Sequence, residues 1–392
     1  MAGVTDTAVE PPVEPPAAPA GSPEPAREGW LATYRYPLTV FALSRVAVYL
    51  LIAAASWTSR IPRESGVSWH GLFGALGQWD VVWYRWIADH GYDPAIGHGN
   101  SAAFFPLYPL LWRPLSILPG PMELWGSLLS TVLFGAALCL LYRITLGRYD
   151  EAMARRTVLY LSIFPLAFVF SLPYAESLFL LLALGAFAFT WYGRQWEGAA
   201  VGALAVLARP VGIALLPALA WRTYRRHGLR VRPYLPLLLL PLTELAFFAY
   251  LGWRTGDVLA NVHAQERGWE RGVGVLPYVF GYTLWHDVIE GGHLRFLIHM
   301  SFTVLWCGLF YQAWRMRIPG EYLIFAALLI LLPTTGGLLV SIGRFGMVAF
   351  PLFWALADLG EDGRVDTLVK TSFPMLLAAL VMITYSAHTF TP

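Results

Sequence analysis

The sequence predicts an all-α polytopic membrane protein, and three observations support this class. Hydrophobic residues make up 57% of the 392 residues and charged residues only 13%, about half of the roughly 25% usual in soluble domains. The mean hydropathy is +0.54. Apolar stretches of spanning length recur along the chain, separated by short segments rich in Arg. Because helices satisfy all their backbone hydrogen bonds within one segment, such long apolar runs favour helices in lipid.

The composition gives no indication of a metal, a cofactor or a nucleic acid as a ligand. Cys139 and Cys307 are the two cysteines; both lie in apolar stretches without metal-binding spacing, so we expect packed thiols and no bound metal. We expect no cofactor and no nucleic-acid partner. Lys370 is the only lysine, and this preference for Arg is typical of a GC-rich genome.

The chain divides into a tail and one transmembrane domain. Residues 1–29 are rich in Pro, Ala and Glu and predict a disordered tail. Residues 30–392 predict a single transmembrane domain, and no signal peptide is visible. The first span is expected at 36–57. Because Arg27 and Arg35 precede it, the positive-inside rule places the N-terminus in the cytoplasm of a multi-pass cell-membrane protein.

Residues 58–120 then form a long extracytoplasmic loop. Trp79, Trp83, Trp86 and Ile87 recur in it at helical spacing. This pattern predicts an amphipathic helix that lies in the membrane interface, with most of the tryptophans acting as anchors.

Further spans follow, and basic connections between them fix their direction. The expected spans are 122–142, 154–171, 174–192, 233–252, 296–314, 321–341, 345–358 and 367–388. Connections 143–156, 315–317 and 359–366 are expected in the cytoplasm, whereas 253–295 forms a second extracytoplasmic loop and the C-terminus ends outside. With two half-helices counted separately, the chain has about eleven helical segments.

The segment 197–221 must begin and end on the same side, because Gly193-Arg194 and the basic stretch 221–232 are both expected in the cytoplasm. The break at Arg209-Pro210 resolves this conflict. Two half-helices, 197–208 and 211–221, can rise and return, with non-helical backbone lining a cavity. Arg209 then points into a cavity open to the outside.

This topology gathers polar residues on the extracytoplasmic face. They are Asp80, Asp89, Glu176, Arg209, Gln265 and Arg344. Arginines near a bilayer suggest a phosphate ligand, because guanidinium binds phosphate bidentately and keeps its proton. A structural Arg–Glu network remains an alternative. Asp80 itself can be a functional carboxylate at the membrane, the N-cap of the helix that begins at Val81, or both.

Seven short motifs carry a resemblance to a known family. In chain order they are WD at 79–80, GYD at 91–93, AFFPLYP at 103–109, SLPYAESLF at 171–179, LARPVG at 207–212, HAQERGW at 263–269 and SIGRFGMVAFP at 341–351. Together they resemble the PIG-V family of mannosyltransferases, from about Tyr36 to Leu359. Eukaryotic members of that family add the second mannose to the glycosylphosphatidylinositol precursor from dolichyl phosphate mannose.

The resemblance implies a GT-C-like helical bundle and a polyprenyl-phosphate-sugar-dependent glycosyltransferase. The expected reaction moves mannose to a glycolipid or glycoprotein acceptor on the extracytoplasmic face, with Asp80 as general base. Arg209, Arg344, Glu176, Tyr174 and Gln265 are expected at the donor phosphate and sugar. Residues expected to bind the acceptor or support the site are Trp79, Asp89, Tyr92, Phe105, Tyr108, His263 and Trp269.

Two other functions remain open. A transporter or flippase of a lipid-linked or anionic solute would explain the broken helix at Arg209-Pro210. A noncatalytic scaffold would leave the polar face unexplained. The residues after the WD pair, Val81 and Val82, differ from the small residue usual in the family, so the donor sugar and the acceptor stay open.

Overall fold

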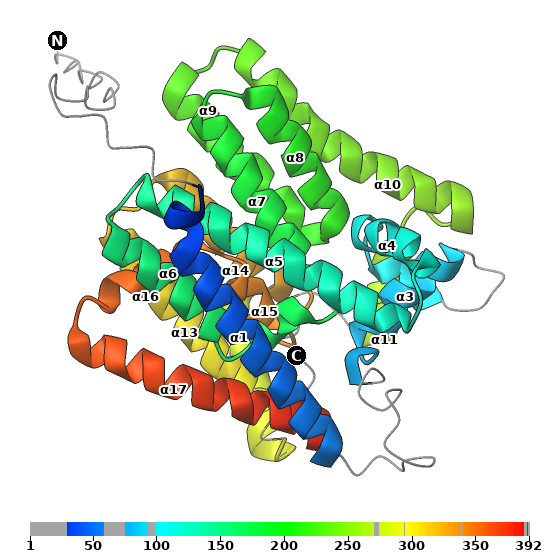
Figure 1. The fold of residues 1–392 in the computed structure, drawn as a ribbon. Helices are drawn as coiled ribbons and strands as arrows, with labels where there is room; N and C mark the ends of the chain where they lie inside the picture. Colours follow the sequence, from blue (N-terminus) through cyan, green and yellow to red (C-terminus); the bar gives the residue numbers. More distant parts are fainter. Residues whose placement is uncertain are drawn as a thin grey trace, which may run out of the picture.

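The computed structural model describes residues 30–58, 75–92, 99–269, 274–293, 295–337, 339–387 and 390. Within these ranges the chain is helical and has no β-strand, so the all-α class is confirmed (Figure 1). The expected tail, residues 1–29, and parts of both expected extracytoplasmic loops lie outside the described residues.

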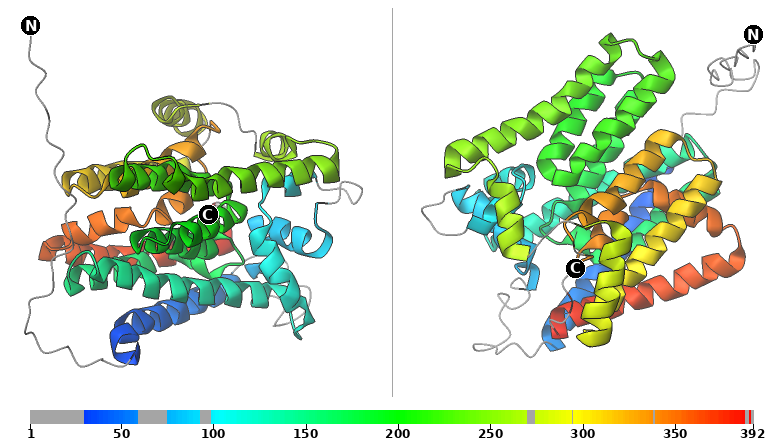
Figure 2. Two further views of the ribbon diagram at one scale, coloured as in Figure 1. Left: turned by 90° about the horizontal axis from the view of Figure 1, so that it is seen from above. Right: turned by 180° about the vertical axis from the view of Figure 1, so that it is seen from behind.

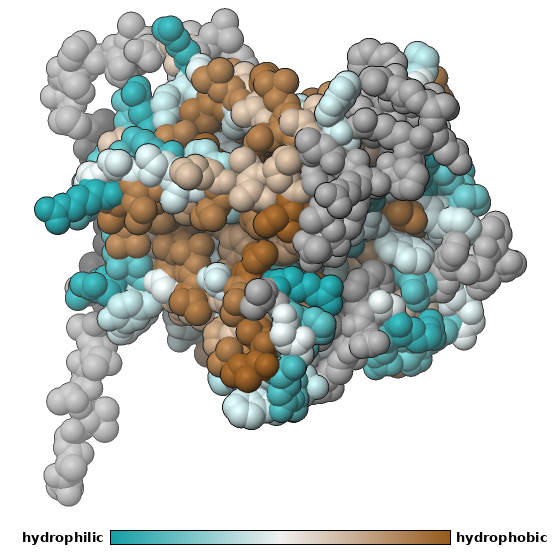
Figure 3. All heavy atoms as spheres, turned by 90° about the horizontal axis from the view of Figure 1, so that it is seen from below, coloured by the Kyte–Doolittle hydropathy of each residue, from teal (hydrophilic) through white to brown (hydrophobic). Residues whose placement is uncertain are grey.

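Five of the described helices are long and apolar enough to cross a membrane. They are α1 (Trp30–Thr58), α5 (Met122–Leu146), α10 (Leu239–Thr255) with the 3-10 helix Arg232–Leu238 before it, α13 (Arg295–Arg315) and α17 (Gly363–Met382). Large apolar side chains such as Leu43, Leu242 and Leu376 are exposed on them, as expected of lipid-facing helices. Apolar residues also cover the middle of the face in Figure 3, with polar residues toward its margins. A multi-pass membrane protein is therefore supported.

Two of the expected spans are interrupted instead of continuous. The expected span 154–171 is α6 (Glu151–Ile163) followed by the 3-10 helix Ala167–Ser171, and 345–358 is split between α15 (Ile342–Met347) and α16 (Pro351–Leu359). The first break has a local cause: Phe164 precedes Pro165, and a residue before proline avoids the helical region, consistent with its ψ of 144°. The shorter apolar helices α7 (Glu176–Trp191) and α14 (Gly320–Thr334) complete the apolar bundle.

A helical hairpin occupies the segment in which the sequence predicts two half-helices. α8 (Gln195–Ala208) ends at Arg209, whose extended backbone has φ −154° and ψ 146°, and the 3-10 helix Pro210–Ala214 leads into α9 (Leu215–His227). A Cβ on Gly193, just before α8, would lie 3.6 Å from Nη1 of Arg226 near the end of α9. α8 and α9 are therefore antiparallel, and Arg209 lies at the turn between them.

The bundle is built by successive packing of its helices. α5 packs on α1 and α7, α7 packs on α8, and α8 packs on α10. α1 and α10 consequently lie on opposite sides of the molecule in the view from above (Figure 2, left). The second half of the chain closes the bundle through α13, α14 and α16, with α16 against α6.

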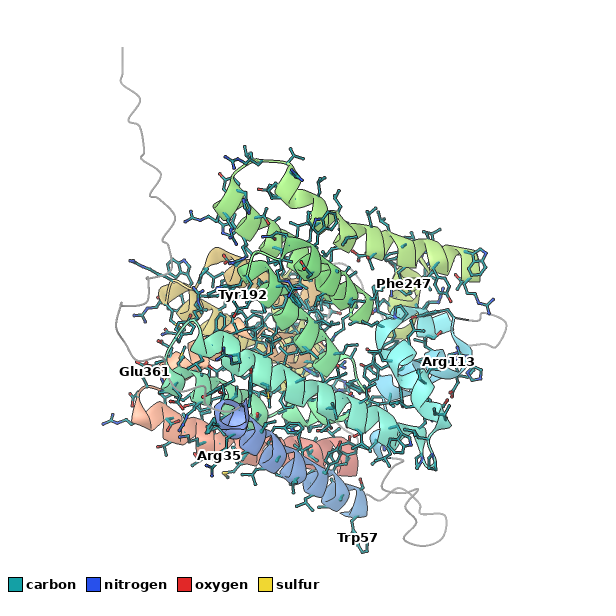
Figure 4. All side chains as sticks on the ribbon, turned by 45° about the horizontal axis from the view of Figure 1, so that its top comes forward. Arg35, Trp57, Arg113, Tyr192, Phe247 and Glu361 are labelled. Carbon is teal, nitrogen blue, oxygen red and sulfur yellow. The ribbon has the colours of Figure 1, made fainter. Side chains whose placement is uncertain are left out.

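A compact group of short helices covers one end of the bundle. It contains α3 (Asp80–His90), the 3-10 helix Gly99–Ala103, α4 (Leu107–Trp112) and the 3-10 helix Arg113–Ile117, and α11 (Ala260–Trp269) packs against Gly99–Ala103. α12 (Leu276–Tyr282) and the π-helix Thr283–Glu290 follow α11 in the chain. Figure 4 shows Arg113, Phe247 and Trp57 toward this end, and Arg35 and Glu361 toward the other.

The structure changes the interpretation of α3. We predict it as an interfacial helix, but one face of it is buried in the protein, through Val81, Tyr84, Ile87 and Ala88. Trp83, expected as a membrane anchor, stacks on Phe104 with ring centroids 6.4 Å apart. α3 is therefore docked on the bundle, and its register fixes the direction of Asp80.

Candidate functional site

Four charged side chains meet at the covered end of the bundle. Nη1 of Arg344 donates to Oδ2 of Asp80 at 2.6 Å and to Oε1 of Glu176 at 3.1 Å. Nη1 of Arg209 lies 2.8 Å from the same Glu176 oxygen. The four side chains are only 1–15% exposed. We call Asp80, Glu176, Arg209 and Arg344 the charged cluster; its two carboxylates and two guanidiniums formally cancel.

Each member of the charged cluster lies at the start of a helix, at a turn between helices or in a short helix. Asp80 and Glu176 are the first residues of α3 and α7, Arg209 lies at the turn of the α8–α9 hairpin, and Arg344 lies in the short α15. The sequence predicts these four residues on one face from topology alone, and the structure brings them into direct contact. Glu176 also benefits from the N-terminal end of the α7 dipole, which favours a negative charge.

The N-cap alternative for Asp80 does not hold. α3 begins at Asp80 and its N-cap position is Trp79, which makes no side-chain capping bond. Trp79 has φ 55° and ψ −125°, a backbone region that costs a non-glycine residue about 1–3 kcal/mol. Its ring packs edge-on against Tyr385 at 5.2 Å between centroids. Asp80 follows this residue directly, and its carboxylate pairs with Arg344.

Arg344 is held in a similar way. Ser341, at the N-cap of α15, adopts the left-handed conformation with φ 67°, and its Oγ accepts a hydrogen bond from Nη2 of Arg344 at 2.8 Å. The guanidinium lies 5.1 Å from the ring centroid of Tyr174, and that of Arg209 lies 4.6 Å from the ring of Phe345. Among the described non-glycine residues, Trp79, Ser341 and Arg317 have positive φ. Two of these three directly precede the helices that carry Asp80 and Arg344.

Some buried donors of the site have no hydrogen-bond acceptor among the described residues. They are Nε of Arg344, Nη1 of Arg209 and the hydroxyl of Tyr174. Nη1 of Arg209 is close to Glu176, but the ion pair lacks hydrogen-bond alignment. Buried donors without acceptors are costly. These three groups therefore suit a ligand that brings several acceptor oxygens, such as a phosphate.

Sequence reasoning missed Tyr84. Its side chain is buried, and its ring centroid lies 6.4 Å from that of Tyr174. Burial raises the pKa of the Tyr84 phenol and the Glu176 carboxylate raises it further, so the hydroxyl keeps its proton and can donate a hydrogen bond. Its position four residues after Asp80 on one helix was the available signal.

Other predicted site residues have structural partners away from the charged cluster. Asp89 pairs with Arg85 at 2.7 Å, and Arg85 also bridges to Glu123 at 2.8 Å. Nδ1 of His263 lies 2.7 Å from Asp257, whose pKa this hydrogen bond lowers.

Three of them stabilise the loop that carries the AFFPLYP motif. The Tyr92 hydroxyl donates to the carbonyl of Phe104 at 2.7 Å, and Gln265 donates to that of Ala103 at 3.2 Å. Phe105 is buried with its ring centroid 4.6 Å from that of Phe247.

Tyr108 and Trp269 are the last two predicted residues. The hydroxyl of Tyr108 donates to the carbonyl of Gly126 at 2.8 Å and bonds Oγ of Ser130 at 2.7 Å. Trp269 ends α11, and its side chain lies outside the described part of the chain. In the described ranges, no three His, Cys, Asp or Glu side chains gather as a metal site requires.

The charged cluster and the helical fold define a membrane protein with a buried site of paired carboxylates and arginines. Residues 53–227 match the family model described as mannosyltransferase (PIG-V), which confirms the resemblance seen in the motifs. The matched region includes Asp80, Glu176 and Arg209, and Arg344 lies beyond it. No curated protein matches the chain.

Solved structures with some similarity come from an archaeon. An Archaeoglobus fulgidus oligosaccharyltransferase tethered to an acceptor peptide matches with a TM-score of 0.49 and 14% identity, over 93% of this chain and 56% of that one. The oligosaccharyltransferase AglB of the same organism, in complex with an inhibitory peptide and a dolichol-phosphate, matches with a TM-score of 0.45 and 13% identity, over 92% and 55%. The chain thus spans little more than half the length of these proteins.

Proposed function

We propose that this chain is a membrane glycosyltransferase that moves mannose from a polyprenyl phosphate donor to a hydroxyl group of a glycolipid or glycoprotein. The observation that carries this proposal is the charged cluster, which joins two carboxylates to two arginines in a buried site. The match to the mannosyltransferase (PIG-V) family model supports the transfer of a sugar. The motif resemblance supports a lipid-linked donor, and we place the reaction on the extracytoplasmic face.

The donor phosphate binds where the unused donors of the site lie. Nε of Arg344 has no acceptor among the described residues, and Nη1 of Arg209 pairs with Glu176 without an aligned hydrogen bond. An arginine fork holds a phosphate through two parallel hydrogen bonds. The hydroxyl groups of Tyr174 and Tyr84 add neutral donors beside them. Because the four charges of the cluster cancel, the phosphate must compete with Asp80 and Glu176 for the arginines.

That competition gives Asp80 its role. In the structure the Asp80 carboxylate is bound to Arg344 at 2.6 Å. When the phosphate takes the Arg344 guanidinium, Asp80 becomes free to accept a proton. The base is thus released only after the donor has bound, and it then lies next to the phosphate whose ester bond will break.

In the transfer step, Asp80 takes up the proton and the two arginines stabilise the leaving group. The acceptor hydroxyl gives its proton to Asp80 while its oxygen bonds to the anomeric carbon. The bond between that carbon and the phosphate oxygen breaks, and the electron pair leaves with the lipid phosphate, which Arg209 and Arg344 stabilise. The sugar passes through an oxocarbenium-like state, as in glycoside hydrolysis. We expect no metal or cofactor to be needed, because the donor already carries its leaving group.

The transporter alternative is not favoured, because the family match supports transfer and the charged cluster suits catalysis. Purified protein in detergent tests this directly, since transport cannot register there. Incubated with polyprenyl phosphate mannose and a lipid extract, it should form a mannosylated product and free polyprenyl phosphate. GDP-mannose serves as the matched donor without a lipid and should give no product. Absence of turnover with the lipid-linked donor across glycolipid and glycoprotein acceptors would refute the proposal.

A further inference from the structure

A third buried arginine, outside the charged cluster, lies in the first transmembrane helix. Arg45 is near the middle of α1 and is 3% exposed. No carboxylate of the described residues pairs with it. Its guanidinium lies 4.7 Å from the ring centroid of Phe134, and its N–H groups bind backbone and hydroxyl oxygens only. A charge placed in a membrane helix is expensive and usually has a function.

The hydrogen bonds of Arg45 converge on the break after α6. Nη2 donates to the carbonyl of Ser162 at 3.0 Å, and Nη1 donates to the carbonyl of Ala167 at 2.8 Å and to Oγ of Ser171 at 3.1 Å. Ser162 belongs to the last turn of α6, whose carbonyls have no partner within the helix. The cation also complements the negative end of that helix. Arg45 therefore caps α6 from a neighbouring helix and fixes the 3-10 helix that follows.

The segment fixed in this way leads directly into the charged cluster. After Ser171 come four residues and then Glu176. The carbonyl of Ser171 accepts from Oγ of Ser127 at 2.5 Å, and that of Tyr174 accepts from Oγ of Ser130 at 3.2 Å. Both serines lie on α5.

The same side of α1 makes a second contact with this network. The hydroxyl of Tyr49, one turn after Arg45, bonds Oγ of Ser127 at 2.8 Å. A continuous path of hydrogen bonds thus runs from α1 through α5 to the backbone that ends at Glu176.

We propose that Arg45 is a positioning residue for Glu176. It holds the backbone from 162 to 171 in place, and this backbone sets the distance from Glu176 to Arg209 and Arg344. The proposal deepens the proposed function and rests on it for its kinetic consequence, but its structural consequence can be measured without any activity. An arginine suits the role because only its planar fork reaches three oxygens across the break.

The first experiment tests whether Arg45 holds the backbone in place, and it needs no measurement of catalysis. Hydrogen exchange of purified protein in detergent is compared between wild type, Arg45→Gln and Arg194→Gln. Arg194 is the matched control, because its side chain is 56% exposed, pairs with Glu197 three residues on and lies over the ring of Phe189, away from the charged cluster. We expect Arg45→Gln to raise exchange selectively at 164–176, with no such change in Arg194→Gln. Unchanged exchange there, or a uniform rise across the protein, would overturn the proposal.

The second experiment tests whether Arg45 acts through Glu176. Displacement of a catalytic group by about 1 Å can cost 10²-fold, so we expect Arg45→Gln to lower kcat/KM by about 10- to 100-fold per folded molecule. Arg45→Lys keeps the charge and should recover part of this loss. In a double-mutant cycle with Glu176→Gln, the loss from Arg45→Gln should largely disappear, since the group it positions has already been changed. Additive losses would show that Arg45 acts independently of Glu176.

The two experiments separate the possible failures. If wild type transfers no sugar but Arg45→Gln still loosens 164–176, the proposed function fails and the positioning role stands. If Glu176→Gln does not fold, Glu176→Asp replaces it in the cycle, since it keeps the charge and shifts it by one methylene.

Discussion

Replacing Asp80 by Asn should separate sugar transfer from donor binding. The Asp80 carboxylate both blocks Arg344 in the structure, at 2.6 Å, and serves as the base in the proposed reaction. Asn keeps the size and can still accept a hydrogen bond, but it takes no proton at neutral pH. Loss of general-base help typically lowers the rate by 10²–10⁴-fold. We therefore expect a folded Asp80→Asn protein with kcat reduced by about that factor.

In contrast to kcat, which falls, the affinity for the donor should rise in the Asp80→Asn protein. A hydrogen bond between charged groups contributes about 1.5–3 kcal/mol and a neutral one about 1 kcal/mol, so the donor phosphate displaces Asn more easily than Asp by about 1 kcal/mol. That difference corresponds to about a fivefold lower Kd for the donor. Because Glu176 still pairs with Arg344 at 3.1 Å, the loss of stability should stay below the 3–5 kcal/mol typical of a fully unpaired buried charge.

The assay measures mannose transfer and binding of polyprenyl phosphate mannose on the same detergent-purified samples. Asp150→Asn is the matched control, because Asp150 caps α6 by accepting from the backbone N–H of Met153 at 2.7 Å and Asn caps a helix equally well. Asp150→Asn should change neither mannose transfer nor donor binding. Near-normal transfer by folded Asp80→Asn protein, or weaker donor binding, would refute the reasoning.

Three further predictions use other parts of the structure. Arg344→Lys keeps the charge but loses the fork, so the donor KM should rise by about tenfold, as measured by turnover at limiting donor; an unchanged KM would place the phosphate elsewhere. In protein lacking its native cysteines, Glu266→Cys should react with an impermeant thiol reagent on intact cells and Leu229→Cys should not, and the reverse result would invert the expected topology. Arg317→Gly should raise stability in thermal unfolding by about 1 kcal/mol, because Arg317 has φ 55° and glycine adopts this region freely. Arg315→Gly, at the helical end of α13, is its control and should give no gain.

Much of the fold could be predicted, because hydropathy and the distribution of Arg report directly on helices in a membrane. The conflict in the direction of 197–221 predicted the hairpin with Arg209 at its turn. The same argument placed Asp80, Glu176 and Arg344 at one end of the bundle. Few polar residues lie at that end, so each has few possible partners.

What could not be predicted depends on packing between distant segments. The aromatic pattern of α3 fits an interfacial helix and a docked helix equally well, and the burial of Val81, Tyr84, Ile87 and Ala88 in the structure distinguishes them. The two residues that precede the helices of Asp80 and Arg344, Trp79 and Ser341, have positive φ, a conformation that no propensity favours for them. The partners of Arg45 could not be predicted, because they are two backbone carbonyls and two serine hydroxyls, which form no recognisable motif.

If the proposed reaction holds, the electrical neutrality of the charged cluster has a consequence for product release. A polyprenyl phosphate sugar is a phosphodiester with one negative charge, whereas the released polyprenyl phosphate is a monoester with a charge of about −1.5 to −2 near pH 7. The product therefore attracts Arg209 and Arg344 more strongly than the donor did. Return of the proton from Asp80 to the phosphate would lower that charge and let Asp80 and Glu176 reclaim the arginines. The carboxylates that compete with the incoming donor would then also expel the spent lipid carrier and prepare the site for the next turnover.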